Sequence, residues 1–335
     1  MKRNFIRLLT FVLIGGLLLT GCNSKKDSEG SKKLSIVTTI FPQYDFARAI
    51  VKDRADIKML LKPGSEAHSY EPTPQDIKSI ENSSLFIYVG GENDEWVDGI
   101  LDSLTNKPST LKLVEMVDVV NEEIVEGMEH EHGKEVGEKY DHDHKHEHDK
   151  DAKHQEAEHG EIDEHVWTSP KNAIKIVEKL AQEFGQKDPE NKDFYNQNAK
   201  EYIKKLNELD QEFSDVINQA KRKIIVFGDR YPLRYFSDAY GLKYRAAFSG
   251  CSTDTEASAA TVKYLIDKVK EEKIPVVFTI ELSNGKIADS IVDATGAKKM
   301  TFYSCHNVTQ EQLDKGVTYL DMMKENVNSI KEALN

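Results

Sequence analysis

The chain has 335 residues, of which 39% are hydrophobic and 31% charged, and its formal net charge is −13. A mean hydropathy of −0.58 excludes a protein with several membrane spans, and the acidic balance argues against binding to nucleic-acid phosphates. The length favours two lobes over one.

The N-terminus predicts export. Lys2, Arg3 and Arg7 precede an apolar run of about twelve residues, which is the length of a signal-peptide core and too short to span a bilayer comfortably. The following Leu-Thr-Gly-Cys resembles a bacterial lipobox. The resemblance implies that residues 1–21 are removed, that Cys22 carries a lipid, and that the protein is held at the extracytoplasmic face of the cell membrane.

Residues 22–32 have no apolar periodicity and predict a tether. Beyond them, strands alternate with helices, which predicts an α/β fold with two Rossmann-like lobes and mostly parallel sheets. We expect the first lobe at 33–189, a long helix at 190–220 and the second lobe at 221–335. The expected strands lie at 34–40, 57–61, 85–89, 224–227, 243–248, 276–280 and 300–303. The expected helices begin near Pro74 and Pro170 or lie at about 231–240, 258–271, 284–295 and 309–333.

Residues 121–164 hold 17 Asp and Glu against 5 Lys, together with eight of the eleven histidines. Without a periodic apolar face, this stretch predicts a solvated acidic loop inserted in the first lobe. His142, His144, His146 and His148 alternate with acidic residues, and imidazole suits Zn, Cu and Ni. We therefore predict that the loop captures several metal ions weakly.

Three histidines lie outside the loop, namely His68, His165 and His306. His68 lies in PGSEAHSYEPTPQDI, between a predicted strand and a helix. His165 lies in DEHVWTSPKNA, between the acidic loop and the next helix. A lone histidine is more often a structural or surface residue than a ligand, so the surrounding segments decide the interpretation.

These two segments, with the acidic His-rich loop between them, resemble the metal-binding lipoproteins of bacterial zinc and manganese ABC importers. The resemblance extends from about Lys33 to the C-terminus. It implies two α/β lobes joined by one long rigid helix, one ion bound between the lobes, a monomeric receptor, and delivery to a membrane permease with a cytoplasmic ATPase. It also implies that His68 and His165 are the first two ligands.

The second lobe departs from the family pattern. Arg230 occupies the position of the usual third ligand, and a guanidinium cannot ligate a cation. We expect Asp229 to substitute for it, the alternative being that Asp229 caps a helix or pairs with Arg230. His306 is expected to supply the remaining ligand, since no Asp follows the last strand. Glu281 and Glu256 are expected to support the ligands or the lobe.

Cys251 and Cys305 both lie near predicted strand ends. An exported protein can keep a disulfide, so their pairing is one alternative. A thiolate ligand to the metal is the other, and it requires that the two are not bonded to each other.

The set His68, His165, His306 and Asp229 is rich in nitrogen and fits tetrahedral Zn²⁺ better than Mn²⁺. The sequence therefore predicts a lipid-anchored zinc receptor. A receptor for Mn, Ni or Cu and a metal-binding surface adhesin or storage lipoprotein are the alternatives. We do not expect an enzyme, because the chain has no HExxH, GxSxG or CxxC motif.

Overall fold

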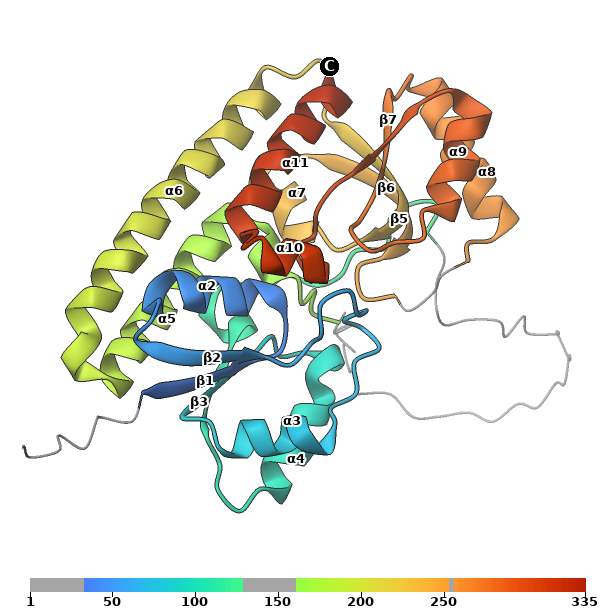
Figure 1. The fold of residues 1–335 in the computed structure, drawn as a ribbon. Coiled ribbons are helices and arrows are strands. Elements are labelled where there is room, and N and C mark those ends of the chain that lie inside the picture. The colour runs from blue at the N-terminus through green and yellow to red at the C-terminus, as the bar shows by residue number, and fades with distance from the viewer. Residues whose placement is uncertain (1–32, 129–160, 253–255) are drawn as a thin grey trace, which may run out of the picture. The chain divides into compact units, whose positions relative to one another are not determined.

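The computed structural model describes residues 33–128, 161–252 and 256–335, and it contains two four-stranded sheets with only parallel strand pairs (Figure 1). The first sheet has the order β2-β1-β3-β4, with strands β1 (Leu34–Thr38), β2 (Ala55–Met59), β3 (Leu85–Tyr88) and β4 (Ser109–Lys112). The second has the order β6-β5-β7-β8, with strands β5 (Ile224–Tyr231), β6 (Lys243–Ser249), β7 (Val276–Thr279) and β8 (Lys298–Thr301). We call each sheet with its helices the first and the second lobe.

Helices cover both faces of each sheet, as expected for parallel sheets. In the first lobe these are α2 (Phe41–Val51), α3 (Pro74–Glu81), α4 (Glu95–Ser103) and α5 (Pro170–Lys187), with the 3-10 turns η2 (Glu92–Asp94), η3 (Leu113–Met116), η4 (Val166–Thr168) and η5 (Pro189–Asn191). In the second lobe they are α7 (Arg234–Tyr240), α8 (Ala259–Glu271), α9 (Lys286–Thr295), α10 (Gln310–Asp314) and α11 (Tyr319–Leu334).

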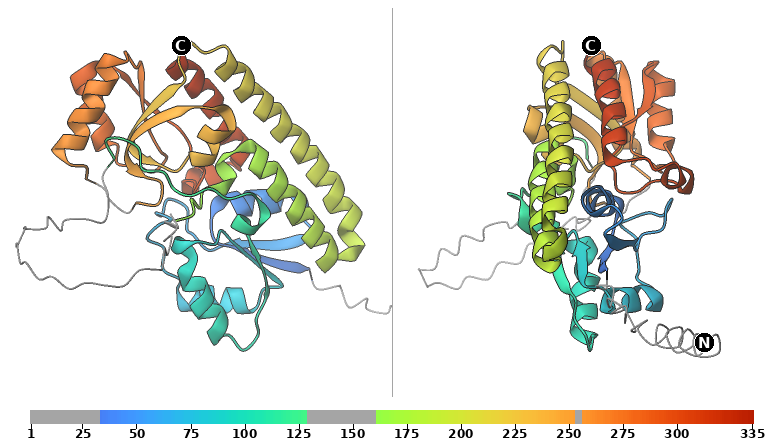
Figure 2. Two further views of the ribbon diagram at one scale, coloured as in Figure 1. Left: turned by 180° about the vertical axis from the view of Figure 1, so that it is seen from behind. Right: turned by 60° about the vertical axis from the view of Figure 1, so that its left-hand side comes forward.

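One long helix, α6 (Lys192–Asn218), joins the lobes (Figure 2). Its 27 residues extend about 40 Å at the usual helical rise. It packs against α5 and α2 of the first lobe and against α11 of the second. The buried face of α6 includes Tyr195, Tyr202, Leu206, Leu209 and Phe213. The apolar residues that recur every three or four positions in the sequence therefore mark the side of the helix that packs against the lobes.

A buried carboxylate connects three of these helices. Asp45 of α2 accepts a hydrogen bond from the Tyr202 hydroxyl of α6 at 3.1 Å and from the backbone nitrogen of Tyr319 in α11 at 2.8 Å. Arg48 completes the group, with Nε 2.6 Å from Asp45 Oδ1. Because each donor comes from a different helix, Asp45 fixes α2, α6 and α11 to one another.

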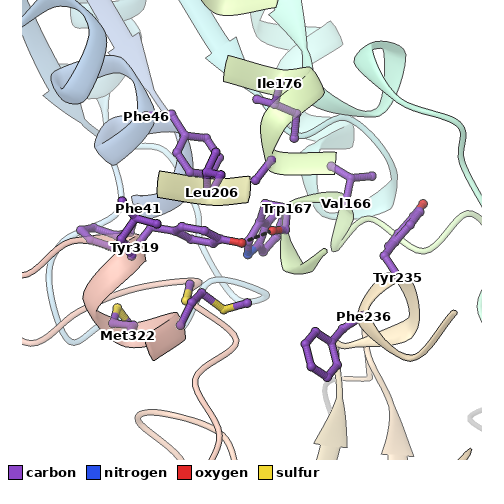
Figure 3. Close-up of a cluster of buried hydrophobic side chains, with 14 of the residues drawn as sticks. Phe41, Phe46, Val166, Trp167, Ile176, Leu206, Tyr235, Phe236, Tyr319 and Met322 are labelled. Carbon is purple, nitrogen blue, oxygen red and sulfur yellow. Dashed lines mark hydrogen bonds between the residues drawn. The ribbon is translucent and has the colours of Figure 1, made fainter. Parts of the chain in front are cut away.

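Below this network, the cores of the two lobes are continuous (Figure 3). Trp167 lies in this core beside Tyr319, and the Tyr319 hydroxyl donates to the Trp167 carbonyl oxygen at 2.8 Å. Both rings are fully buried. The Trp167 ring also packs against the rings of His165, just before η4, and His306, after β8, with centroids 5.6 and 5.0 Å apart.

The predicted fold class is confirmed, and several element bounds differ. Helices α2 and α4 and strand β4 were missed, and the helix expected at 309–333 is two helices. They are separated near Gly316, which has a φ of +72° and ends α10, after which Thr318 caps α11.

Strand β5 continues four residues beyond the predicted end at Phe227 because it contains a bulge. Phe227 pairs with Ala246 and Arg230 with Phe248, so one extra residue stands on β5 between them. Gly228 lies in this bulge, where a side chain would clash with the backbone of Ala288 in α9. The bulge shifts the alternation of β5 just before its end, where Asp229 and Arg230 lie.

Candidate metal centre

Three histidines from three separate segments meet where the lobes adjoin. His68 lies in the loop between β2 and α3, His165 immediately before η4, and His306 in the loop after β8. One nitrogen of each ring lies within 4.8 Å of the others. The ring centroids are 5.6 Å apart for His68 and His165, and 4.8 Å apart for His165 and His306. The structure therefore brings together three of the four residues that the sequence analysis assigned to one metal site.

His165 is oriented by Asp163. The Asp163 Oδ1 atom lies 2.9 Å from the His165 Nδ1 atom and accepts the backbone nitrogen of His165 at 2.8 Å. The His165 Nε2 atom is buried and has no hydrogen-bond partner in the structure. Burial acts to lower the pKa of His165, but the Asp163 carboxylate outweighs it and raises that pKa. A buried imidazole nitrogen without a partner, held by a carboxylate on its other side, is the usual arrangement of a metal ligand.

His306 is oriented by a two-step chain. Its Nδ1 atom lies 2.7 Å from the Ser304 hydroxyl, which donates to the Glu281 carboxylate at 2.7 Å. Since the serine proton is given to Glu281, the His306 Nδ1–H donates to Ser304, and Nε2 keeps its lone pair. Glu281 also accepts the backbone nitrogens of Ser304 and His306 at 2.7 and 2.9 Å. The expectation that Glu281 supports a ligand matches these contacts.

His68 is the least restrained of the three. Its Nδ1 atom is buried without a hydrogen-bond partner, and its backbone nitrogen donates to Glu66 Oε1 at 3.3 Å. Burial and the neighbouring charges of His165 and Arg230 lower the pKa of His68 to about 3. The pKa of His306 also lies well below its usual value because of burial and the other two rings. Both rings are therefore neutral, as metal ligands must be.

The site includes a small cavity of about 30 Å³, lined by the three rings together with Thr39, Ile40, Ala67, Tyr70, Val89, Asn93, Asp94, Trp96, Glu164 and Trp167. This volume is enough for a water molecule or a single ion. Trp167 packs edge-on against His306, with ring centroids 5.0 Å apart, and its Nε1 donates to the Ser304 carbonyl oxygen at 2.8 Å. The tryptophan thus forms a wall of the site and bonds the first lobe to the second.

The second lobe approaches His165 through a glycine. A side chain on Gly250, which directly follows β6, would come within 2.9 Å of the His165 Cε1 atom and 3.1 Å of the Pro232 Cα atom. Only a residue without a side chain fits between the imidazole and this backbone.

Asp229 is not part of the histidine cluster. Its carboxylate accepts the backbone nitrogens of Arg230 at 2.9 Å and Ile280 at 3.4 Å, and it lines a separate pocket of about 300 Å³. Burial raises its pKa. The bulge in β5 sends Arg230, rather than Asp229, toward the first lobe, where Arg230 Nη2 lies 2.8 Å from Glu66 Oε2.

Cys251 and Cys305 are free thiols, so the disulfide considered from the sequence is not formed. Cys305 is buried in the core between Ser304 and His306, with a φ of +64°. Burial raises the pKa values of both thiols, which disfavours the thiolate that a metal requires.

Other predicted residues contribute nothing to this centre. Glu256 is exposed. The lipidation residue Cys22 and the capture histidines His142, His144, His146 and His148 lie outside the described residues. Within the ranges that the structure describes, no helix has both the length and the apolar character needed to cross a membrane.

Sequence reasoning missed Asp163, Ser304 and Trp167. Asp163 and Ser304 each lie two residues before a histidine of the cluster, so a scan for a carboxylate or hydroxyl at that spacing would have found them. Trp167 gives no such signal, because its contact with Ser304 joins residues 137 positions apart.

Comparisons with known proteins agree with this geometry. The family model "Zinc-uptake complex component A periplasmic" (ZnuA) matches residues 36–333. The chain is 33% identical over 330 residues to the "High-affinity zinc uptake system protein ZnuA" of Bacillus subtilis (strain 168), covering 98% of this chain and 96% of that protein. It is 32% identical to the "Zinc-binding lipoprotein AdcA" of Streptococcus pneumoniae (strain ATCC BAA-255 / R6), over 94% of this chain but only 58% of AdcA.

Solved structures show the same two-lobed fold. The Zn(II)-bound ZnuA-like domain of Streptococcus pneumoniae AdcA superimposes with a TM-score of 0.70 at 29% identity, over 90% of this chain and 99% of that domain. The metal-dependent lipoprotein YcdH from Bacillus subtilis gives a TM-score of 0.71 at 30% identity, over the same shares of the two chains. The match over nearly the whole described chain, in sequence and in fold, shows that this protein belongs to the ZnuA family of zinc-uptake components.

Proposed function

We propose that this protein is an extracytoplasmic receptor that binds one Zn²⁺ ion through His68, His165 and His306 and delivers it to an ABC importer. The observation that carries the proposal is the convergence of three ring nitrogens within 4.8 Å, from three segments and both lobes. Nitrogens bound to one tetrahedral zinc at about 2 Å lie about 3.3 Å apart, so the three rings would draw together by up to about 1.5 Å when the ion binds.

The chemistry of the ligands favours zinc. Three neutral imidazoles suit a borderline-soft cation such as Zn²⁺, whereas Mn²⁺ prefers oxygen ligands. Two carboxylates supply negative charge near the ion. Asp163 is bonded directly to His165, and Glu281 is connected to His306 through the Ser304 hydroxyl. Three protein ligands leave the fourth tetrahedral position to water, and an exchangeable ligand suits a site that must release its ion.

Relatives support the same assignment. They include a high-affinity zinc uptake protein, a zinc-binding lipoprotein and a zinc-bound domain of the same fold. We infer the same cargo for this chain. The partners inferred with it are a membrane permease and its cytoplasmic ATPase, and no catalytic role is proposed.

We further propose that Cys22 carries the lipid that holds the mature chain, as a monomer, at the outer face of the membrane. The lipobox-like Leu-Thr-Gly-Cys after an apolar run supports this assignment. The His-rich stretch at 129–160 would capture ions near the receptor and pass them to the single tight site. Its alternating histidines and acidic residues support weak binding of several ions.

Native mass spectrometry of the mature chain during a zinc titration tests the tight site. The comparison includes His68→Ala, His165→Ala and His306→Ala, with His142→Ala as the matched control outside the site. We expect one tight zinc in the wild type and the control, and its loss in the three site variants. Tight binding of manganese or nickel in place of zinc would refute the assignment of the metal.

Two further variants separate the contributions of Asp229 and the His-rich stretch. We expect Asp229→Asn to keep the tight zinc, because the Asp229 carboxylate is bound to Arg230 and Ile280 rather than to the cluster. Deletion of residues 129–160 should also keep it while slowing zinc uptake by cells at low zinc. Loss of tight binding on deletion would make the His-rich stretch the primary site.

A further inference from the structure

The loop that carries His68 belongs to the first lobe by sequence but is bonded to the second. Asn307 Nδ2 donates to the carbonyl oxygens of Lys62 and Ser65, at 2.8 and 2.9 Å. The backbone nitrogen of Gly64 donates to the Val308 carbonyl oxygen at 2.8 Å. The first half of the loop is therefore fixed to the segment that contains His306.

The second half of the loop is tied to the second lobe by one ion pair among the described residues. Glu66 Oε1 accepts the backbone nitrogen of His68 at 3.3 Å, and Glu66 Oε2 lies 2.8 Å from Arg230 Nη2 at the end of β5. A second guanidinium nitrogen, Nη1, donates to the Ser252 carbonyl oxygen at 3.1 Å. The Arg230 side chain is 12% exposed and that of Glu66 45% exposed, so the arginine end is the shielded one.

Arg230 is unsuited to bind a cation directly, because its guanidinium has no lone pair to offer. Its positive charge also contributes to the lowered pKa values of His68 and His306. Its pairing with Glu66 offsets that charge beside the site. One glutamate thus joins the main chain of a ligand residue on one lobe to a fixed guanidinium on the other. No other ion pair among the described residues connects the main chain of a ligand histidine to the opposite lobe.

We propose that the Glu66–Arg230 ion pair ties the His68 loop to the second lobe and sets the rate at which the bound ion escapes. Arg230 is then a positioning residue that acts on His68 through Glu66 and is not a ligand. The metal part of this inference rests on the proposed function, because it concerns release of the ion bound by His68.

The informative variant is the double substitution Glu66→Gln/Arg230→Gln, which removes the tie without changing the net charge beside the site. Stopped-flow mixing of zinc-loaded protein with excess chelator measures the escape rate. We expect escape about three- to tenfold faster in Glu66→Gln and in the double variant, with little further effect from the second substitution. The matched control is Lys298→Gln/Glu332→Gln, an ion pair within the second lobe, which should escape at the wild-type rate.

Hydrogen exchange of the metal-free protein tests the tie independently of zinc. The double variant should exchange the backbone amides of residues 66–70 faster than wild type, while β1 and β7 exchange as before. Unchanged exchange in this loop, or unchanged zinc escape, overturns the inference. A wild-type chain with no tight zinc overturns the proposed function and the metal part of this inference, and the exchange measurement then shows whether the tie itself exists.

Discussion

Asp163 and His165 are bonded twice, because one carboxylate oxygen of Asp163 lies 2.9 Å from the ring nitrogen Nδ1 and 2.8 Å from the backbone nitrogen of His165. The ring and the main chain of His165 are therefore fixed by the same group, and the ring nitrogen Nε2 has no hydrogen-bond partner. This arrangement also determines how the site responds to acid.

We expect Asp163→Asn to weaken zinc binding about 10- to 100-fold at neutral pH. Asp163 raises the pKa of His165, so zinc must displace a proton from this ring at any pH below that raised value. Wild-type affinity should therefore fall as the pH drops through it, and the fall should begin at lower pH in the variant. Zinc competition titrations between pH 5 and 8 measure both effects, with the exposed Asp118→Asn as control. An unshifted pH profile would contradict this role of Asp163.

Ser304→Ala should weaken zinc binding about tenfold, because His306 loses the acceptor that keeps the proton on Nδ1. Ser304→Thr retains the hydroxyl and should recover part of the affinity. Isothermal titration with zinc compares both variants with Ser290→Ala, a serine of α9 that bonds only its own helix. Equal affinities for Ser304→Ala and wild type would show that the Glu281–Ser304 chain does not orient the ring.

Gly250→Ala should lower both zinc affinity and the melting temperature, since the new methyl group would meet the His165 ring and the Pro232 backbone. The control is Gly99→Ala in α4, where a side chain meets nothing within 4 Å. Alanine should stabilise that helix by about 0.5–1 kcal/mol. Thermal melts with and without zinc separate damage to the site from damage to the fold. A Gly250→Ala protein that binds zinc like wild type would remove the close-approach argument.

Asp94 predicts a pH dependence of stability in the metal-free protein. Burial raises its pKa from 3.8 to about 6, although Gly90 and Val89 donate to its carboxylate. The folded state then binds more protons than the unfolded state between these values, so the free energy of unfolding should fall as the pH rises from about 4 to about 6. Asp94→Asn should flatten this decline by about 1–3 kcal/mol. Urea unfolding with chelator present, from pH 4 to 7, provides the measurement, and an identical slope in the variant would reject it.

The sequence singles out the three clustered histidines because few histidines lie outside the acidic stretch. With eight of eleven histidines in one acidic stretch, the other three stand out, and His68 and His165 each lie in a segment shared with a family. His68 and His306 lie beyond the carboxyl ends of strands β2 and β8, where ligands bind in open α/β sheets, whereas His165 follows no strand and its place beside them cannot be derived in this way.

Asp229 shows where this reasoning stops. Alternation along β5 cannot tell which of Asp229 and Arg230 reaches the first lobe once a bulge inserts a residue. Helix α2 was missed for a related reason, since its first residues, Phe41 and Pro42, continue the apolar run of β1. Gly316 and the capping residue Thr318 indicate a break between α10 and α11. The prediction of one helix at 309–333 followed the apolar spacing instead.

The long helix α6 has a mechanical consequence for release of the ion. Asp45 fixes α6 to α2 and α11, and the cores of the two lobes are continuous beneath Trp167. Parting the lobes would break this network and expose the shared core, whereas lifting the His68 loop breaks the Glu66–Arg230 ion pair and a few hydrogen bonds to Asn307 and Val308. We therefore expect the ion to leave when the His68 loop alone moves away from the second lobe. We expect a permease that unloads such a receptor to displace the His68 loop without separating the two lobes.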